Sequence, residues 1–206
     1  EVVTTLLLNF VVLLFVSMML EGPMKDPMGM GWPQSAPVLP EAELPRLAER
    51  TRLHAGLILA LAAAGAMWLV MFRTVWGYEA RAVGGNARAA AFAGMPVGWI
   101  TVRTALISGA LAGLAGAIEV TGLKGYLTLD LSPGFGYGGI VVAMLAQLHP
   151  AGVVAGAVFV AGVFVGSDAM SRGIAVPTYI ADVIVAVSLI CMLVASLFVR
   201  YRLRRG

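Results

Sequence analysis

The side chains that could do chemistry are few and scattered along this sequence. His54 and His149 have no carboxylate or cysteine at a metal-ligand spacing, and Cys191 stands alone in an apolar run. We therefore predict no metal site, no cofactor and no internal disulfide. The glycine-rich run 133–139 lacks the Gly-Lys-Ser/Thr ending of a phosphate-binding loop. Because no convergent catalytic set accompanies these residues, we do not expect an enzyme.

Three polar or aromatic residues are better candidates for contact with a small solute. Asn9 lies midway along an apolar run, where its amide could bond a substrate hydroxyl or a neighbouring helix. Phe135 and Tyr137 flank the glycine-rich backbone. Their rings could stack on a base or a sugar, or they could pack between helices or at a membrane interface. Both interpretations stay open for all three residues.

The composition places these residues in a membrane protein. Of 206 residues, 60% are hydrophobic and 12% are charged, whereas a soluble domain carries about 25% charged residues. The excess apolar surface must face lipid or other membrane helices. The net charge is +3, but the basic residues do not form one patch, so we do not expect nucleic acid as a partner. Several of them cluster between Arg73 and Arg103 and in the tail 200–205, which is typical of cytoplasmic segments.

The apolar runs predict an all-α, polytopic transmembrane bundle. A helix needs about 20 residues to cross the hydrocarbon core. We predict about six membrane segments, at residues 2–20, 55–72, 102–120, 136–148, 152–166 and 179–199. Glu119 and Asp182 are the ionisable residues nearest to membrane depth, and they could face either a pathway or the outer interface.

The segment 136–148 is too short to cross the membrane alone. If the loop 73–101 and the arginine tail are both cytoplasmic, four crossings must separate them, and this segment has to be one of the four. We therefore predict a broken crossing, completed by non-helical chain at about 126–135. The alternative is that 136–148 and 152–166 are tilted helices in a thin membrane. If the loop 73–101 is cytoplasmic, the preceding loop 21–54 is extracytoplasmic. Its many prolines predict a mostly irregular backbone.

The stretch 78–96 predicts a short helix with a signal at each end. Gly84 and Gly85 would break the chain, and Asn86 is a good N-cap. The residues from 87 to 93 are mostly strong helix formers, and Gly94 can take the left-handed position that ends a helix. Because so short a helix is marginal in water, we expect something to dock against it.

This stretch resembles the cytoplasmic coupling-helix loop of bacterial ABC importer permeases of the branched-chain amino acid and ribose type. The residues that carry the resemblance are Arg81, Ala82, Val83, Gly84, Asn86, Ala89, Ala90, Ala93 and Gly94. Residues 1–9, 131–140 and 166–170 resemble more narrowly the nucleoside and simple-sugar branch, which is linked to basic membrane proteins. One departure is Gln147-Leu148, where relatives often carry Gly and a polar or basic residue.

The resemblance implies a permease subunit that forms the pathway for a nucleoside or a simple sugar. It implies cytosolic ATPase subunits that hydrolyse ATP, a second permease subunit and an extracytoplasmic substrate-binding protein. The chain would be the C-terminal part of one transmembrane domain in the bacterial cell membrane, with its N-terminal helices missing and its C-terminus cytoplasmic. The residues expected to couple to the ATPase are Arg81, Gly84, Asn86, Arg88, Ala89, Ala90 and Gly94.

Other functions stay open. Branched-chain amino acids are an alternative cargo within the same family. A membrane carrier outside this family, or an assembly protein, is the alternative class. A carrier driven by ions usually holds several ionisable residues at mid-membrane depth, and the apolar runs here do not.

Overall fold

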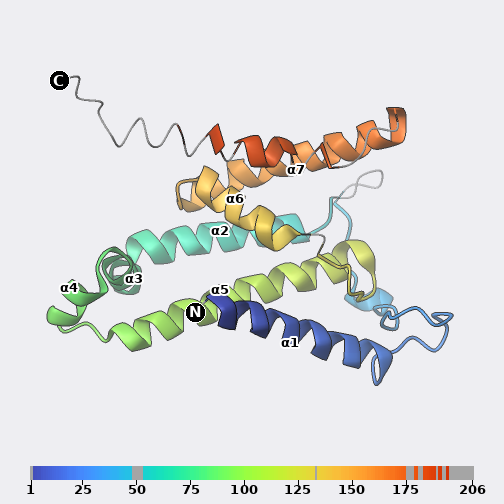
Figure 1. Ribbon diagram of the computed structural model, residues 1–206, viewed down its shortest axis with the longest axis horizontal. Coiled ribbons are helices and arrows are strands. Elements are labelled where there is room, and N and C mark those ends of the chain that lie inside the picture. The colour runs from blue at the N-terminus through green and yellow to red at the C-terminus, as the bar shows by residue number, and fades with distance from the viewer. Residues whose placement is uncertain are drawn as a thin grey trace. The chain divides into compact units, whose positions relative to one another are not determined.

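The computed structural model describes residues 2–47, 53–132, 134–174, 179–180, 183–188, 190–191 and 194. In this part of the chain the regular structure is helical, which confirms the predicted all-α class (Figure 1). The elements are α1 (Val2–Glu21), the 3₁₀ turn η1 (Pro40–Ala42), α2 (Gly56–Arg73), α3 (Val75–Gly85), α4 (Ala87–Phe92), α5 (Val97–Glu119), the π-helical turn η2 (Val120–Lys124), α6 (Phe135–Leu145) and α7 (Pro150–Ile174).

Three helices in the described part are long and apolar enough to cross a membrane: α2, α5 together with η2, and α7. α1 is an apolar helix of 20 residues, whereas α6 has only 11. Most large apolar side chains on α1, α2 and α5 are exposed, and such surfaces need lipid or other helices to cover them. The number of crossings stays a prediction, and part of the predicted segment 179–199 lies outside the described residues.

Two of the predicted membrane segments are parts of longer helices. The segment placed at 102–120 begins at Val97 and continues through η2 to Lys124, and the segment placed at 152–166 runs from Pro150 to Ile174. An apolar run predicts only the apolar part of a helix. The polar turns at each end are also helical, because their backbone hydrogen bonds continue. The loop 73–101 also contains the helix α3, which the sequence analysis did not predict.

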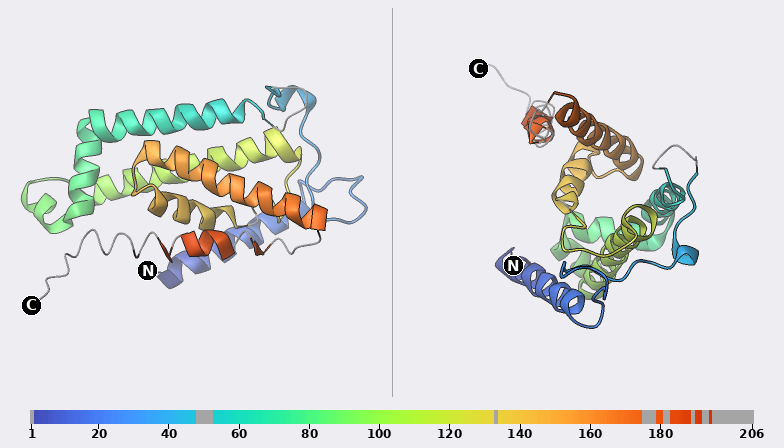
Figure 2. Two further views of the ribbon diagram at one scale, coloured as in Figure 1. Left: turned by 90° about the horizontal axis from the view of Figure 1, so that it is seen from above. Right: turned by 90° about the vertical axis from the view of Figure 1, so that its right-hand side faces the viewer.

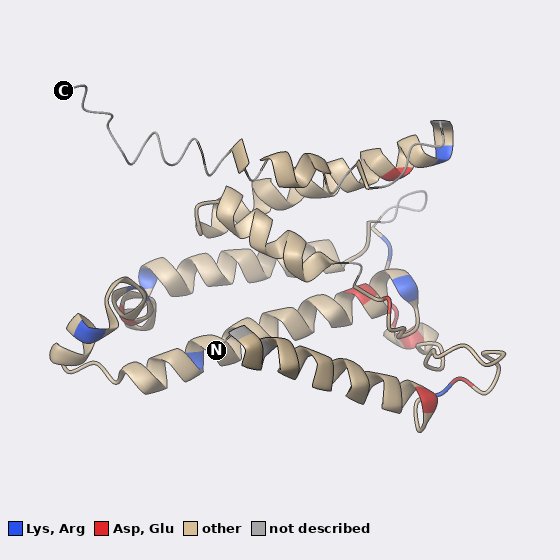
Figure 3. Cartoon of the chain, in the orientation of Figure 1, with Lys and Arg blue, Asp and Glu red and all other residues tan. Residues whose placement is uncertain are grey.

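The chain divides into two compact units. The first comprises Glu1–Ala63 and Val75–Pro133. In it α3 packs against α4 and α5, and α3 runs across the direction of α5 (Figure 2). Charged residues of this unit gather towards its ends, and the middle of α1 and α5 is largely free of them (Figure 3). This distribution fits helices whose middle parts lie in lipid.

The predicted irregular loop 21–54 is tied to the far end of α5. Ser35 N–H donates to the Leu127 carbonyl (3.0 Å), and Leu127 N–H donates to the Ser35 hydroxyl (2.8 Å). Val38 N–H donates to the Gly125 carbonyl (2.7 Å). These bonds satisfy backbone groups that neither segment satisfies within itself, so the loop is irregular but ordered.

The second unit comprises Ala64–Thr74 and Gly134–Gly206. Its described part includes a hairpin of α6 and α7. A side chain at Gly152 would come within 3.0 Å of the Ala146 carbonyl oxygen, and one at Gly156 would come within 3.4 Å of Val142. These glycines therefore let the two helices approach closely, as their four-residue spacing suggests.

Candidate functional site

The helix α4 has a structural cap at each end, as the sequence predicted. At its start, Asn86 has an extended backbone (φ −159°, ψ 100°), and its Oδ1 accepts a hydrogen bond from Ala89 N–H at 3.0 Å. At its end, Gly94 is left-handed (φ +81°). Its N–H donates to the Ala91 carbonyl, and Met95 N–H donates to the Ala90 carbonyl, each at 3.0 Å. This is the complete Schellman arrangement, so a helix of only six residues is fixed in shape. We name α4 with its two caps, residues 86–94, the capped helix.

One face of the capped helix is buried and the opposite face is exposed. Ala90 is only 4% exposed, and α4 packs against α3 and α5. Arg88 and Phe92 are four residues apart and therefore share a face, and that face lies opposite to Ala90. Phe92 is 93% exposed. The capped helix thus presents a cation and an aromatic ring side by side.

Sequence reasoning missed Phe92. Helix propensity predicts that residues 87–93 are helical, but it does not predict which of them lie on the buried face and which on the exposed face. The available signal was the spacing, because Phe92 is the one large apolar side chain among small ones and lies two residues from Ala90. Ala89, which was predicted as a coupling residue, is exposed beside this face.

The predicted chain break at Gly84 and Gly85 was wrong. Both are helical residues at the end of α3, and the break comes at Asn86, whose N–H still bonds the Ala82 carbonyl at 3.0 Å. Glycine allows a break but does not require one, and the N-cap geometry of Asn86 decides where the chain turns. Arg81, also a predicted coupling residue, is exposed on α3.

The capped helix rests on a packed support. The Arg103 guanidinium carbon on α5 lies 4.9 Å from the centroid of the Trp76 ring on α3, a cation–π distance. Ile100, in the first turns of α5, is 2% exposed. α3 and α5 are therefore held together beside α4.

The candidate pathway residues lie on two different helices. Asn9 is midway along α1 and its side chain is exposed. Phe135 and Tyr137 form the first turn of α6, and both are exposed. This turn follows Gly134, whose left-handed backbone (φ +79°) starts the helix. Between η2 and α6 the described chain is irregular, as predicted, but Phe135, the last residue of the predicted stretch 126–135, already begins α6.

The remaining titratable candidates are Glu119, Asp182 and the histidines. Glu119 is half-buried at the end of α5, and η2 continues the helix beyond it. Asp182 lies outside the described residues. His54 Nδ1 accepts the Gly56 N–H at 3.1 Å, and its ring packs so closely on Gly122 that a Cβ there would come within 2.6 Å of it. The imidazole therefore accepts a backbone hydrogen bond at the start of α2 and packs against η2.

The departure at Gln147-Leu148 lies in the turn between α6 and α7. Both residues are left-handed, with φ of 51° and 60°. A left-handed conformation costs a residue with a side chain roughly 1–2 kcal/mol, which glycine avoids. The ring of the adjacent His149 lies 5.3 Å from the ring of Phe72, so the turn is held against the end of α2 within the second unit.

Comparisons with known proteins give the chain a family. A family model described as "Branched-chain amino acid transport system / permease component" matches residues 1–193. The chain is 34% identical to the glucose ABC transporter permease protein TsgB13 of Haloferax volcanii over 221 aligned residues, which cover 100% of this chain and 58% of that protein. It is 34% identical to the guanosine ABC transporter permease protein NupP of Bacillus subtilis over 198 residues, which cover 95% of this chain and 56% of that protein.

A third relative is also an ABC transporter permease. The chain is 27% identical to the nucleoside ABC transporter permease protein NupB of Lactococcus lactis over 194 residues, which cover 90% of this chain and 53% of that protein. The chain thus spans a little more than half the length of these relatives. No solved structure gives a significant match. Together the matching family model and the apolar helices identify this chain as a multi-pass membrane protein of the family of branched-chain amino acid transport system permease components.

Proposed function

We propose that this chain is part of the permease subunit of an ABC importer for nucleosides or simple sugars. A separate cytosolic ATPase subunit drives it through the capped helix. The observation that carries this proposal is the capped helix itself, which is fixed at both ends and presents Arg88 and Phe92 away from its buried side. The names of the relatives, which specify glucose, guanosine and nucleosides, support the cargo class.

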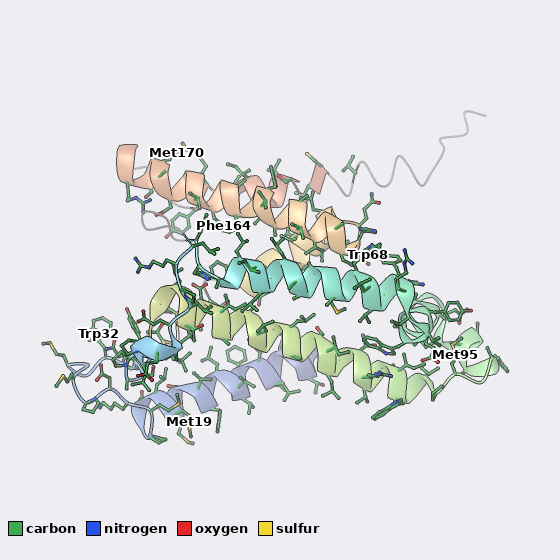
Figure 4. The ribbon with its side chains drawn as sticks, turned by 180° about the vertical axis from the view of Figure 1, so that it is seen from behind. Met19, Trp32, Trp68, Met95, Phe164 and Met170 are labelled. Carbon is green, nitrogen blue, oxygen red and sulfur yellow. The ribbon has the colours of Figure 1, made fainter. Side chains whose placement is uncertain are left out.

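The proposed orientation follows from the length of one helix. α5 with η2 has 28 residues, or about 40 Å at 1.5 Å per residue, which exceeds a hydrocarbon core of about 30 Å. Met95, next to the capped helix, and Trp32, in the loop 21–54, lie at opposite ends of the first unit (Figure 4). The arginines at 73, 81, 88 and 103 favour a cytoplasmic position for the capped helix. The loop 21–54 is then extracytoplasmic, and the arginine-rich C-terminus is cytoplasmic.

Coupling in this arrangement is mechanical. Nucleotide binding draws the ATPase subunits together, and each carries the capped helix with it. Because α4 cannot unwind easily at either cap, the displacement reaches α3 and α5 through Ala90 and through the contact of Trp76 with Arg103. ATP hydrolysis itself belongs to the partner subunit.

The pathway is proposed to lie beside α6. Its 11 residues cover only about 16 Å, so the irregular chain before it would complete a broken crossing. Asn9, Phe135 and Tyr137 are the candidates for contact with the solute. A second permease subunit, identical or different, would close the pathway.

Substitution of the outward face tests the proposal. In the full-length permease assembled with its ATPase, we expect Phe92→Ala to reduce ATP-dependent uptake at least about tenfold, because interface aromatic anchors commonly contribute 2 kcal/mol or more. Arg88→Glu should act in the same direction. Uptake of a panel of nucleosides, sugars and branched-chain amino acids into vesicles measures both the loss and the cargo class.

Trp99→Ala is the matched control, since Trp99 is an exposed aromatic on α5 outside the capped helix. It should retain most of the uptake. Normal uptake by Phe92→Ala, in a complex that still contains the ATPase, would show that the capped helix does not couple the two subunits. Uptake limited to branched-chain amino acids would move the cargo to the alternative class.

A further inference from the structure

The end of α2 contacts the turn between α6 and α7 through a row of rings. Trp68, towards the end of α2 (Figure 4), and Phe72 have ring centroids 6.3 Å apart, and the centroids of the Phe72 and His149 rings are 5.3 Å apart. The Arg73 guanidinium carbon lies 5.8 Å from the centroid of the Trp68 ring. Aromatic pairs and cation–π pairs attract at these separations. We name Trp68, Phe72 and His149, which all belong to the second unit, the aromatic row.

α2 otherwise packs little in the described part of the chain. Gly56 is the one buried residue of α2. The helix pairs that pack extensively among the described residues are α3 with α4, α3 and α4 with α5, and α6 with α7, so α2 is not one of them. Because the backbone of α2 lacks such packing, the ring contact between Phe72 and His149 joins α2 to the hairpin of α6 and α7 through side chains.

His149 is fixed by its backbone to both helices of that hairpin. Its N–H donates to the Ala146 carbonyl at the end of α6, and its carbonyl accepts the Val153 N–H in the first turn of α7, each at 3.0 Å. Just before it, the Leu148 N–H donates to the Ala143 carbonyl at 2.9 Å. Because consecutive residues of the turn are bonded in this way, a shift of His149 moves the end of α6 and the start of α7 together.

The hairpin is packed closely enough to move as one body. Gly152 and Gly156 bring α7 against the last turns of α6, and Val142 on α6 shares a buried core with Val160 on α7. Interiors packed in this way have low compressibility and transmit strain. A force applied at His149 therefore reaches the whole of α6.

The other end of this connection leads to the capped helix. α2 ends at Arg73 and α3 begins at Val75, so Thr74 is the single residue between the two helices. The Thr74 hydroxyl donates to the Val70 carbonyl at 2.6 Å, which holds this residue against the last turn of α2. α3 in turn packs against α4. The chain thus leads from the capped helix through α3 and one joining residue to the aromatic row.

We infer that Phe72 and His149 are positioning residues that pass a displacement of the capped helix to α6, whose first turn holds Phe135 and Tyr137. This inference rests on the proposed function, because it needs an ATPase that moves the capped helix and a pathway beside α6. Its own evidence is the ring contact of α2 with the hairpin and the hydrogen bonds that fix His149. Since two rings in contact are what the connection requires, another aromatic side chain should serve at position 149.

The test uses the full-length permease, assembled with its ATPase and its solute-binding protein in proteoliposomes, with guanosine and glucose as probes. Uptake and ATP hydrolysis are measured in the same vesicles. Phe72→Ala and His149→Ala should each lower the solute taken up per ATP hydrolysed at least about threefold, because an aromatic pair contributes a factor of up to about ten. ATP hydrolysis should change less than about twofold, whereas a merely structural role would lower assembly, uptake and hydrolysis together.

Three further variants sharpen the test. His149→Phe keeps a ring at the contact and should retain most of the uptake per ATP. The double variant Phe72→Ala with His149→Ala should be no worse than either single one, since the two side chains act as one contact. Phe159→Ala is the matched control, because Phe159 is an exposed aromatic of α7 outside the aromatic row, and it should leave uptake per ATP unchanged. If Phe72→Ala does not assemble, Phe72→Leu removes the ring but keeps an apolar side chain, and it should show the same loss.

Unchanged uptake per ATP in both alanine variants would overturn the inference, as would an equal fall of uptake and hydrolysis. A loss in His149→Phe as large as that in His149→Ala would also overturn it, and so would an equal loss in Phe159→Ala. Failure of the unmodified assembly to take up either probe, or normal uptake by Phe92→Ala, refutes the proposed function instead. Uptake that falls in Phe92→Ala but not in the variants of Phe72 and His149 refutes the positioning role alone.

Discussion

The capped helix and residues 26–34, which we name the braced loop, are two short segments of the first unit. The backbone of each is fixed by hydrogen bonds of a different kind. Each carries exposed apolar side chains on backbone that is fixed by local hydrogen bonds. The capped helix uses backbone geometry, with Asn86 at one end and Gly94 at the other. The braced loop uses a carboxylate, Asp26, which accepts hydrogen bonds from the Met28 N–H and from the Gln34 side chain.

The left-handed positions differ in an informative way. In the capped helix this position is Gly94, where only the backbone matters. In the braced loop it is Met30, a residue that fits the conformation poorly. The capped helix thus ends at a glycine that fits its left-handed conformation, whereas the braced loop holds a left-handed residue with a large side chain. Variants that alter one kind of bracing should therefore leave the other segment unaffected.

The largest effect is expected from Gly94→Pro. Proline holds φ near −65°, far from the +81° observed, and it lacks the N–H that bonds the Ala91 carbonyl. The end of α4 should be lost at a cost of about 3 kcal/mol or more, and ATP-dependent uptake should fall to background. Gly85→Ala is the matched control, because Gly85 is helical with open space around it. Uptake near the unmodified level in Gly94→Pro would mean that the shape of the capped helix is unimportant.

A smaller effect is expected from Asp26→Ala. It removes the acceptors of Met28 N–H and of the Gln34 amide, and at about 1 kcal/mol for each of these solvent-accessible hydrogen bonds the total loss is about 2 kcal/mol. Peptides that cover residues 24–36 should then exchange amide hydrogens roughly thirtyfold faster, since 1.4 kcal/mol is a factor of about ten. Asp26→Asn keeps one carbonyl acceptor and should show a smaller increase. If α4 also exchanged faster in Asp26→Ala, the two segments would not be independently braced.

The smallest effect is expected from Asn86→Ala. Loss of an N-cap side chain costs about 1 kcal/mol, so peptides that cover residues 87–93 should exchange roughly fivefold faster. Asn86→Asp keeps an acceptor for the Ala89 N–H and should behave like the unmodified protein. An equal increase in both variants would show that the hydrogen bond does not hold the first turn. Uptake should fall only modestly, since Gly94 still fixes the other end.

Local signals in the sequence predicted the ends of α4 correctly. An N-cap and a left-handed glycine act through hydrogen bonds between residues that are close in the chain, so their effect can be read from the order of residues. The same reasoning failed at Gly84 and Gly85, where two glycines allowed a break that the packing of α3 did not use.

The sequence by itself determined that the chain is a helical membrane protein, where its apolar helices run and how α4 is capped. These features depend on composition and on contacts a few residues apart. Only the tertiary structure decided which face of α4 is exposed and how the braced loop is tied to the linker before α6. Phe92 and Ala90 are both apolar in the sequence, and packing against α3 and α5 alone separates the exposed residue from the buried one. Ser35 and Leu127 are 92 residues apart, and no local pattern predicts a hydrogen bond across that distance.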